Sequence, residues 1–177
     1  MRTMLGIARG ERKPMSLPAD PSPPWRRLAA LVYDLLIVVA IVMVVGLACQ
    51  LATGGRLIAT GAHVRIPWWY QALQGAVVAA YFIASWRRGG QTLGMRAWRV
   101  RVSRDDGGAI GLLQAFTRLA VGAAPLALLL VEPLAGAHAT AWLLAGTWTI
   151  WFACTLFDPR RRALHDLAAD TELRRLA

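Results

Sequence analysis

The stretch LAALVYDLLIVVAIVMVVGLAC, residues 28–49, decides which class of fold this chain can adopt. It holds about 22 residues and a single charged side chain, Asp34. An α-helix rises about 1.5 Å per residue, so a helix of this length spans the roughly 30 Å hydrocarbon core of a bilayer. The stretch therefore predicts a membrane-spanning helix.

Three more apolar segments follow, over about 67–86, 110–131 and 139–157. The first of these has aromatic residues at both ends, as expected where a helix meets the two membrane interfaces. Hydrophobic residues make up 56% of the 177 residues and charged residues 17%, an apolar surplus that soluble domains do not carry. The pattern predicts an all-α membrane protein built as a four-transmembrane-helix bundle.

The placement of basic residues predicts the orientation of this bundle. Seventeen of the 20 Lys and Arg residues lie before the first apolar segment, between the second and third, or after the fourth. The other two loops hold only Arg56 and Arg65. Basic loops stay on the cytoplasmic side, so we expect both termini and the 87–109 loop to be cytoplasmic. The net charge of +10 comes without the motifs of a nucleic-acid-binding module, so no nucleic-acid partner is expected.

Composition also divides the chain into an arm, a membrane domain and a tail. Residues 1–23 are rich in Pro and charge and predict a flexible cytoplasmic arm, 24–171 form the transmembrane domain, and 172–177 form a cytoplasmic tail. Between helices two and three, residues 98–102 alternate apolar and basic side chains, and 105–108 read Asp-Asp-Gly-Gly, which is typical of a turn. These residues predict a small cytoplasmic hairpin between helices 2 and 3.

Three segments resemble motifs of the RDD family of bacterial membrane proteins. They are PWRRLAALVYD at 24–34, GQTLGMR at 90–96 and LHDLAADT at 164–171. Met95 replaces a Lys found in many members, and Asp170 replaces the usual Gly before the Thr. The resemblance implies an RDD-type transmembrane domain in the bacterial inner membrane. It also marks seven cytoplasmic motif residues: Gly90, Gln91, Thr92, Gly94, His165, Asp166 and Thr171.

Asp34 is the position that says most about function, because an ionisable residue about two turns inside a membrane helix is costly and usually faces a bundle interior or a polar cavity. Arg27 lies about 10 Å lower along the same helix, so we expect no direct contact between the two. Arg118 lies about eight residues into the third helix, at a similar depth, and is the expected ion-pair partner of Asp34. Such a pair can be a structural lock, or Asp34 can carry a proton or cation during transport.

His165 and Asp166 are adjacent, but neighbouring side chains on a helix point in different directions. We therefore expect a helix cap or an interhelical tether and not a catalytic dyad. The sequence holds no nucleophile elbow, no HExxH motif and no paired acidic cluster, so we expect no enzyme activity, no catalytic residue, no metal site and no cofactor.

Two functions are compatible with these features. The first is transport of an ion or small solute by an oligomer, with Arg27, Asp34 and Arg118 at its polar centre, since transport is generally proposed for the RDD family and cation/proton antiport has been attributed to some members. The alternative is a non-transporting membrane scaffold or assembly partner. The expected partners are anionic lipid head groups, an ion or small solute, and further copies of the chain or another membrane protein.

Overall fold

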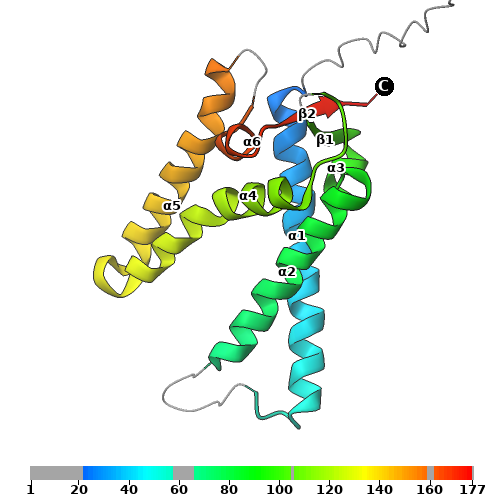
Figure 1. Ribbon diagram of the computed structural model, residues 1–177. Helices are drawn as coiled ribbons and strands as arrows, with labels where there is room; N and C mark the ends of the chain where they lie inside the picture. Colours follow the sequence, from blue (N-terminus) through cyan, green and yellow to red (C-terminus); the bar gives the residue numbers. More distant parts are fainter. Residues whose placement is uncertain (1–21, 58–65, 105, 159–161, 177) are drawn as a thin grey trace, which may run out of the picture.

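The computed structural model describes residues 22–57, 66–104, 106–158 and 162–176 (Figure 1), so most of the predicted arm lies outside the described residues. Two long helices begin the fold, a short helix and a strand follow, and a second helical pair leads to the C-terminal segment. The elements are α1 (Pro24–Ala52), α2 (Trp68–Gly89), α3 (Leu93–Ala97), β1 (Val100–Arg104), α4 (Leu112–Ala123), the 3-10 helix η1 (Ala124–Val131), α5 (Glu132–Phe157), α6 (Leu164–Ala168) and β2 (Thr171–Arg175).

Two described segments are long and apolar enough to cross a membrane, namely α1 and the stretch Leu112–Phe157. Their apolar side chains are mostly turned outward: Met43 is 68% exposed, Leu130 81% and Leu134 90%. Water does not tolerate contiguous apolar surface of this extent, whereas lipid does. The protein is therefore a mainly helical membrane protein.

The stretch Leu112–Phe157 reverses direction at Gly136, whose φ of 80° and ψ of 158° interrupt the helix. Glycine adopts a positive φ without the steric penalty that a Cβ would bring. The apolar segment predicted at 110–131 is a regular α-helix up to Ala123 and continues as the more tightly wound 3-10 helix η1. The last helix, α5, begins at Glu132, before the start predicted at residue 139. In Figure 1, α5 runs back beside η1, so this stretch forms a helical hairpin.

The predicted cytoplasmic hairpin is wrong, because β1 pairs with the C-terminal strand and not with a neighbouring one. The pairing is antiparallel and runs from Val100 opposite Arg175 to Arg104 opposite Thr171. The predicted turn after β1 does form, since the Gly107 N–H donates to the Arg104 carbonyl at 2.9 Å. A turn signal predicts reversal of the chain but does not say which strand will be the partner. Residues 172–175, assigned to a tail by composition, therefore belong to the sheet.

A small core lies where β1, β2, α3 and α6 meet the ends of the long helices, which we call the sheet end of the molecule (Figure 1). Its residues are contributed by segments far apart in the chain. They are Ala30, Trp86, Met95, Val100, Val102, Ile110, Ala115 and Leu173. The sheet end is thus the part of the described protein in which side chains pack around a common interior.

Candidate functional site

Asp34 lies ten residues into α1, which places it about 15 Å along the helix, and it is 6% exposed. Its carboxylate accepts three hydrogen bonds. Thr92 Oγ1 donates to Oδ2 at 2.5 Å, while the Gly94 N–H and the Tyr81 hydroxyl donate to Oδ1 at 3.0 and 3.1 Å. Asp34 therefore joins α1 to α2 and to the turn that leads into α3.

The motif residues at 90–94 make this contact possible. Gly90 caps the C-terminal end of α2 with a φ of 69°, which turns the chain back toward α1. The Gln91 side chain donates to the Val100 carbonyl at 2.8 Å, and Thr92 caps α3 by accepting from the Met95 N–H. Gly94 approaches α1 so closely that a Cβ there would lie 2.8 Å from Asp34 Cγ. Each of these residues has a direct part in bringing α3 onto α1.

The predicted ion pair between Asp34 and Arg118 is wrong. Arg118 is 3% exposed and donates to Asp166 Oδ1, and it also donates to Thr171 Oγ1 at 2.9 Å. Its guanidinium lies over the Trp86 ring, 5.2 Å from the centroid. The prediction compared only the depths of Asp34 and Arg118 along their helices. It did not consider the C-terminal segment, which folds back and brings the Asp166 carboxylate to Arg118.

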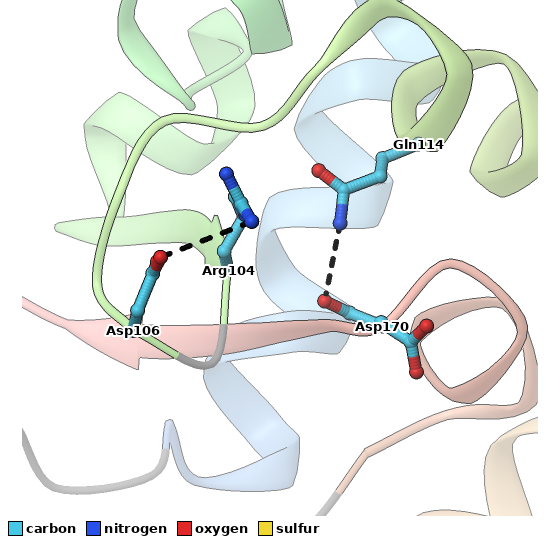
Figure 2. Close-up of a pocket in the computed structure, with 4 residues that line it drawn as sticks. All are labelled: Arg104, Asp106, Gln114 and Asp170. Atoms are coloured by element: carbon cyan, nitrogen blue, oxygen red, sulfur yellow. Dashed lines mark hydrogen bonds and ion pairs between the residues drawn. The ribbon is translucent and has the colours of Figure 1, made fainter.

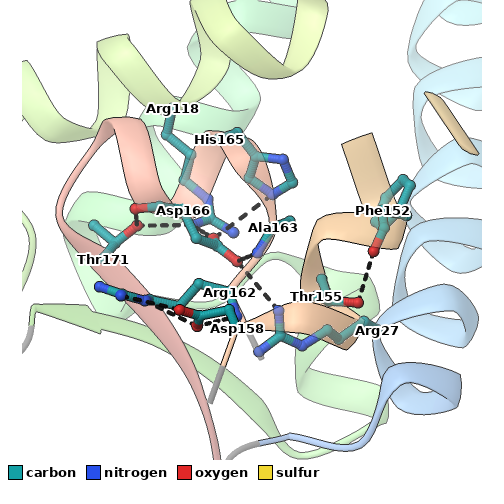
Figure 3. A network of polar contacts seen from close by, with 10 residues as sticks. All are labelled: Arg27, Arg118, Phe152, Thr155, Asp158, Arg162, Ala163, His165, Asp166 and Thr171. Atoms are coloured by element: carbon teal, nitrogen blue, oxygen red, sulfur yellow. Dashed lines mark hydrogen bonds and ion pairs between the residues drawn. The ribbon is translucent and has the colours of Figure 1, made fainter. Parts of the chain in front are cut away.

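Asp166 is fully buried and forms the centre of a second polar cluster (Figure 3). Arg27 Nη1 donates to Asp166 Oδ2 at 3.2 Å, and Arg118 binds the other oxygen. The N–H of Ala163 donates to Oδ2 at 3.0 Å, which caps the start of α6. Because Arg27 belongs to α1 and Arg118 to α4, Asp166 links the two helical pairs. The expectation of a cap or interhelical tether is confirmed for Asp166.

Burial and the charges of this cluster together shift the pKa values of Asp166 and His165. Burial alone would raise the pKa of Asp166, but Arg118, then His165 and Arg27, together with the Ala163 N–H, hold it below its usual value. Burial lowers the pKa of His165 to about 4, although the neighbouring Asp166 opposes the shift. His165 is therefore neutral at physiological pH and lies with Nε2 at 3.6 Å from Asp166 Oδ1.

The depressed pKa of His165 predicts a pH-dependent stability. An unfolded histidine titrates near 6.5, so below that pH the unfolded chain binds a proton that the folded chain does not take up until about pH 4. Lowering the pH from about 6.5 toward 4 should therefore cost up to about 3 kcal/mol of stability. Thermal unfolding in detergent across this range should show the slope in the native protein, and His165→Gln should flatten it. An equal slope in both proteins would contradict this origin.

The departure from the family pattern at Asp170 also has a structural explanation. Asp170 has a φ of 49°, in the left-handed region where glycine is unstrained and where Asp is tolerated better than most residues. It lines a hollow of about 330 Å³ together with Arg104, Asp106 and Gln114 (Figure 2). Met95, the other departure, is 8% exposed and packs in the core of the sheet end.

The structure thus separates the expected polar centre into two clusters, one around Asp34 and one around Asp166. Sequence reasoning missed Tyr81, whose hydroxyl binds Asp34. A signal was present, because Tyr81 carries one of the few polar groups in the apolar middle of α2. Within the described residues there is no group of three or more His, Cys, Asp or Glu side chains that could hold a metal ion.

Comparison with known proteins agrees with the three motif segments. The model of the RDD family matches residues 21–170, from just before α1 to the residue preceding β2. No curated protein and no solved structure matches the chain. The matched range contains both polar clusters except for Thr171 at the start of β2.

Proposed function

We propose that this chain, which belongs to the RDD family, is a four-span protein of the bacterial inner membrane that moves an ion or small solute and exchanges it for a proton at Asp34. The four spans would be α1, α2, the limb formed by α4 and η1, and α5. With the basic segments on the cytoplasmic side, the sheet end and both termini would face the cytoplasm.

The observation that supports transport is the chemistry of the groups bound to Asp34. Two of its three donors are hydroxyls, from Thr92 and Tyr81. A hydroxyl can accept a hydrogen bond as well as donate one. If Asp34 takes up a proton, a hydroxyl can turn and accept from it, so the network survives the change of charge. The side chains of Asp34, Thr92 and Tyr81 also present oxygen atoms, which are the ligands that a hard cation prefers.

Asp166 differs from Asp34 in this respect. Its charged partners are the guanidinium groups of Arg27 and Arg118, which donate and cannot accept. Protonation of Asp166 would therefore remove the carboxylate charge that both buried guanidinium groups bind. Asp166 suits a permanent structural tie, whereas Asp34 suits a group that gains and loses a proton.

The path for a transported species would require more than one copy of the chain. A single carboxylate with two hydroxyls is a small site, and the outward faces of α1 and α5 are apolar. We propose that further copies, or another membrane protein, complete the polar route beside Asp34. The oligomeric state in detergent and in lipid would be measured alongside transport.

Transport would be tested in liposomes that contain the purified protein, with pH and alkali-cation gradients imposed separately. Asp34→Asn should abolish flux, because an amide cannot bind and release a proton, and it should keep its thermal transition, because an amide oxygen still accepts hydrogen bonds. Asp106→Asn is the matched control, since it makes the same chemical change at a carboxylate that is exposed. Undiminished flux in folded Asp34→Asn protein would refute the carboxylate mechanism.

A scaffold role is the second candidate, and a specific observation favours it. The motif residues around Asp34 and Asp166 have partners within the chain, and these contacts join the elements of the sheet end to one another. If the native protein passes no ion or solute under any gradient, the scaffold function would replace transport. The exposed side of the sheet end would then be the surface presented to a partner.

A further inference from the structure

Three aromatic side chains gather on the outer side of α1 at the sheet end. The rings of Trp25 and Trp98 meet edge to face with centroids 5.6 Å apart, and those of Tyr33 and Trp98 do so at 6.0 Å. Trp25 is 55% exposed and Tyr33 is 48% exposed. Trp25 and Tyr33 therefore lie outside the core, while Trp98 is half-buried and packs against it. Together the three rings form a surface at the level where α1 would enter the membrane, which is where Trp and Tyr are enriched.

Arg26 is fixed within this aromatic surface. Its guanidinium lies 4.9 Å from the centre of the Trp25 ring, and Nη1 donates to the Trp98 carbonyl at 3.2 Å. Unlike Arg27 and Arg118, it forms no ion pair with any carboxylate of the described residues. A guanidinium has five N–H groups, so most of its donors remain available. The arginine is oriented by its neighbours, and no carboxylate of the described residues compensates its charge.

Further positive charge and apolar surface adjoin Arg26. Arg96 and Arg99 are exposed and lie within two residues of Trp98. Along α1, Val32 and Leu36 follow Trp25 on the same helical face and are 48% and 63% exposed. Asp34 lies on the opposite face, which is turned to the protein interior. A cationic group thus stands at one end of an apolar strip that runs along the membrane-facing side of α1.

We propose that the surface formed by Trp25, Arg26, Tyr33 and Trp98 binds an anionic phospholipid. The phosphate would pair with the Arg26 guanidinium, with Arg96 and Arg99 adding attraction, because guanidinium and phosphate form strong charge-assisted hydrogen bonds. The acyl chain would lie along Val32 and Leu36. The apolar strip favours a lipid over free phosphate, since a free ion would gain nothing from it. This assignment does not depend on whether the protein transports anything.

The test compares the full-length protein in nanodiscs of phosphatidylcholine alone with nanodiscs that also contain phosphatidylglycerol. Native mass spectrometry would measure the lipid retained, and thermal unfolding would measure the resulting stabilisation. Arg26→Gln should weaken retention of phosphatidylglycerol about fivefold, which corresponds to one juxtamembrane arginine. Arg56→Gln is the matched control, because it removes the same charge beyond the other end of α1, and it should retain the lipid as the native protein does.

A further arm adds inorganic phosphate to protein in phosphatidylcholine nanodiscs, and we expect no stabilisation. Equal loss in Arg26→Gln and Arg56→Gln would mean that only overall charge matters and would overturn the proposed site. Stabilisation by inorganic phosphate equal to that by phosphatidylglycerol would overturn the lipid assignment. Trp25→Leu provides a second variant, since an exposed ring can be removed without opening the core. Unchanged lipid retention in both Arg26→Gln and Trp25→Leu would also contradict the proposal.

Discussion

Asp166→Asn should destabilise the folded protein by about 3–5 kcal/mol, the usual result of removing one partner from a buried ion pair. Asp166 has no exposed surface, and its carboxylate lies between arginines of two different helices. Loss of its charge leaves Arg27 and Arg118 close together in a poorly solvated interior. The Ala163 N–H would also lose a charged acceptor at the start of α6. Thermal unfolding in detergent would measure the loss.

A double-mutant cycle with Arg118→Leu would show whether pairing is the cause. Each single change should be destabilising, and the double variant should be more stable than the sum of the two losses predicts, because Asp166→Asn no longer removes a counter-charge from a buried Arg118 once that arginine is a leucine. Asp106→Asn is the control, since the pair formed by Arg104 and Asp106 is exposed and 3.9 Å apart and should contribute less than about 1 kcal/mol. Strictly additive losses at Asp166 and Arg118 would contradict the tie between α4 and α6.

The membrane character of the chain could be predicted from sequence because it depends on composition and length alone. The stretch 28–49 lies within α1, and the segment at 67–86 corresponds closely to α2. The positions of the motif segments were also sufficient to identify the family that the family model matches. Each of these inferences uses local information, in which the residues concerned lie within one apolar segment or one short motif.

The partners of the polar residues could not be predicted in the same way. Asp34 and Arg118 were paired because they share a depth, yet the carboxylate that Arg118 binds lies 48 residues further along the chain. Strand β1 was predicted, but its partner β2 lies in the last residues of the sequence. Such contacts depend on how the C-terminal segment folds back onto the helices, and no periodicity or spacing in a single sequence encodes that path.

The motif glycine at 94 also has a role that its sequence position alone did not reveal. The resemblance marked Gly94 only as a motif residue, whereas the structure places it against α1 and not at a positive φ. Gly94 is required here because it has no side chain that would collide with α1. The backbone of α3 can therefore approach Asp34 closely enough for the Gly94 N–H to donate to its carboxylate at 3.0 Å.

Gly94→Ala should therefore destabilise the protein by about 3 kcal/mol, more than a glycine to alanine change normally does. The added Cβ would lie 2.8 Å from Asp34 Cγ and 2.9 Å from the Asp34 backbone nitrogen, and a rigid helix backbone cannot yield by rotating a side chain. Overpacking of this kind costs about 1–3 kcal/mol, and losing the hydrogen bond to a charged carboxylate adds about 1.5 kcal/mol or more.

Gly89→Ala is the matched control, because Gly89 ends α2 only five residues earlier and a Cβ there would meet no atom within 4 Å. Alanine favours helix more than glycine does, so this variant should be as stable as the native protein or slightly more stable. Both proteins would be unfolded thermally in the same detergent. If Gly94→Ala and Gly89→Ala behave alike, α3 does not depend on close approach to α1, and the hydrogen-bonded contact at Asp34 must then tolerate a wider separation of the two helices.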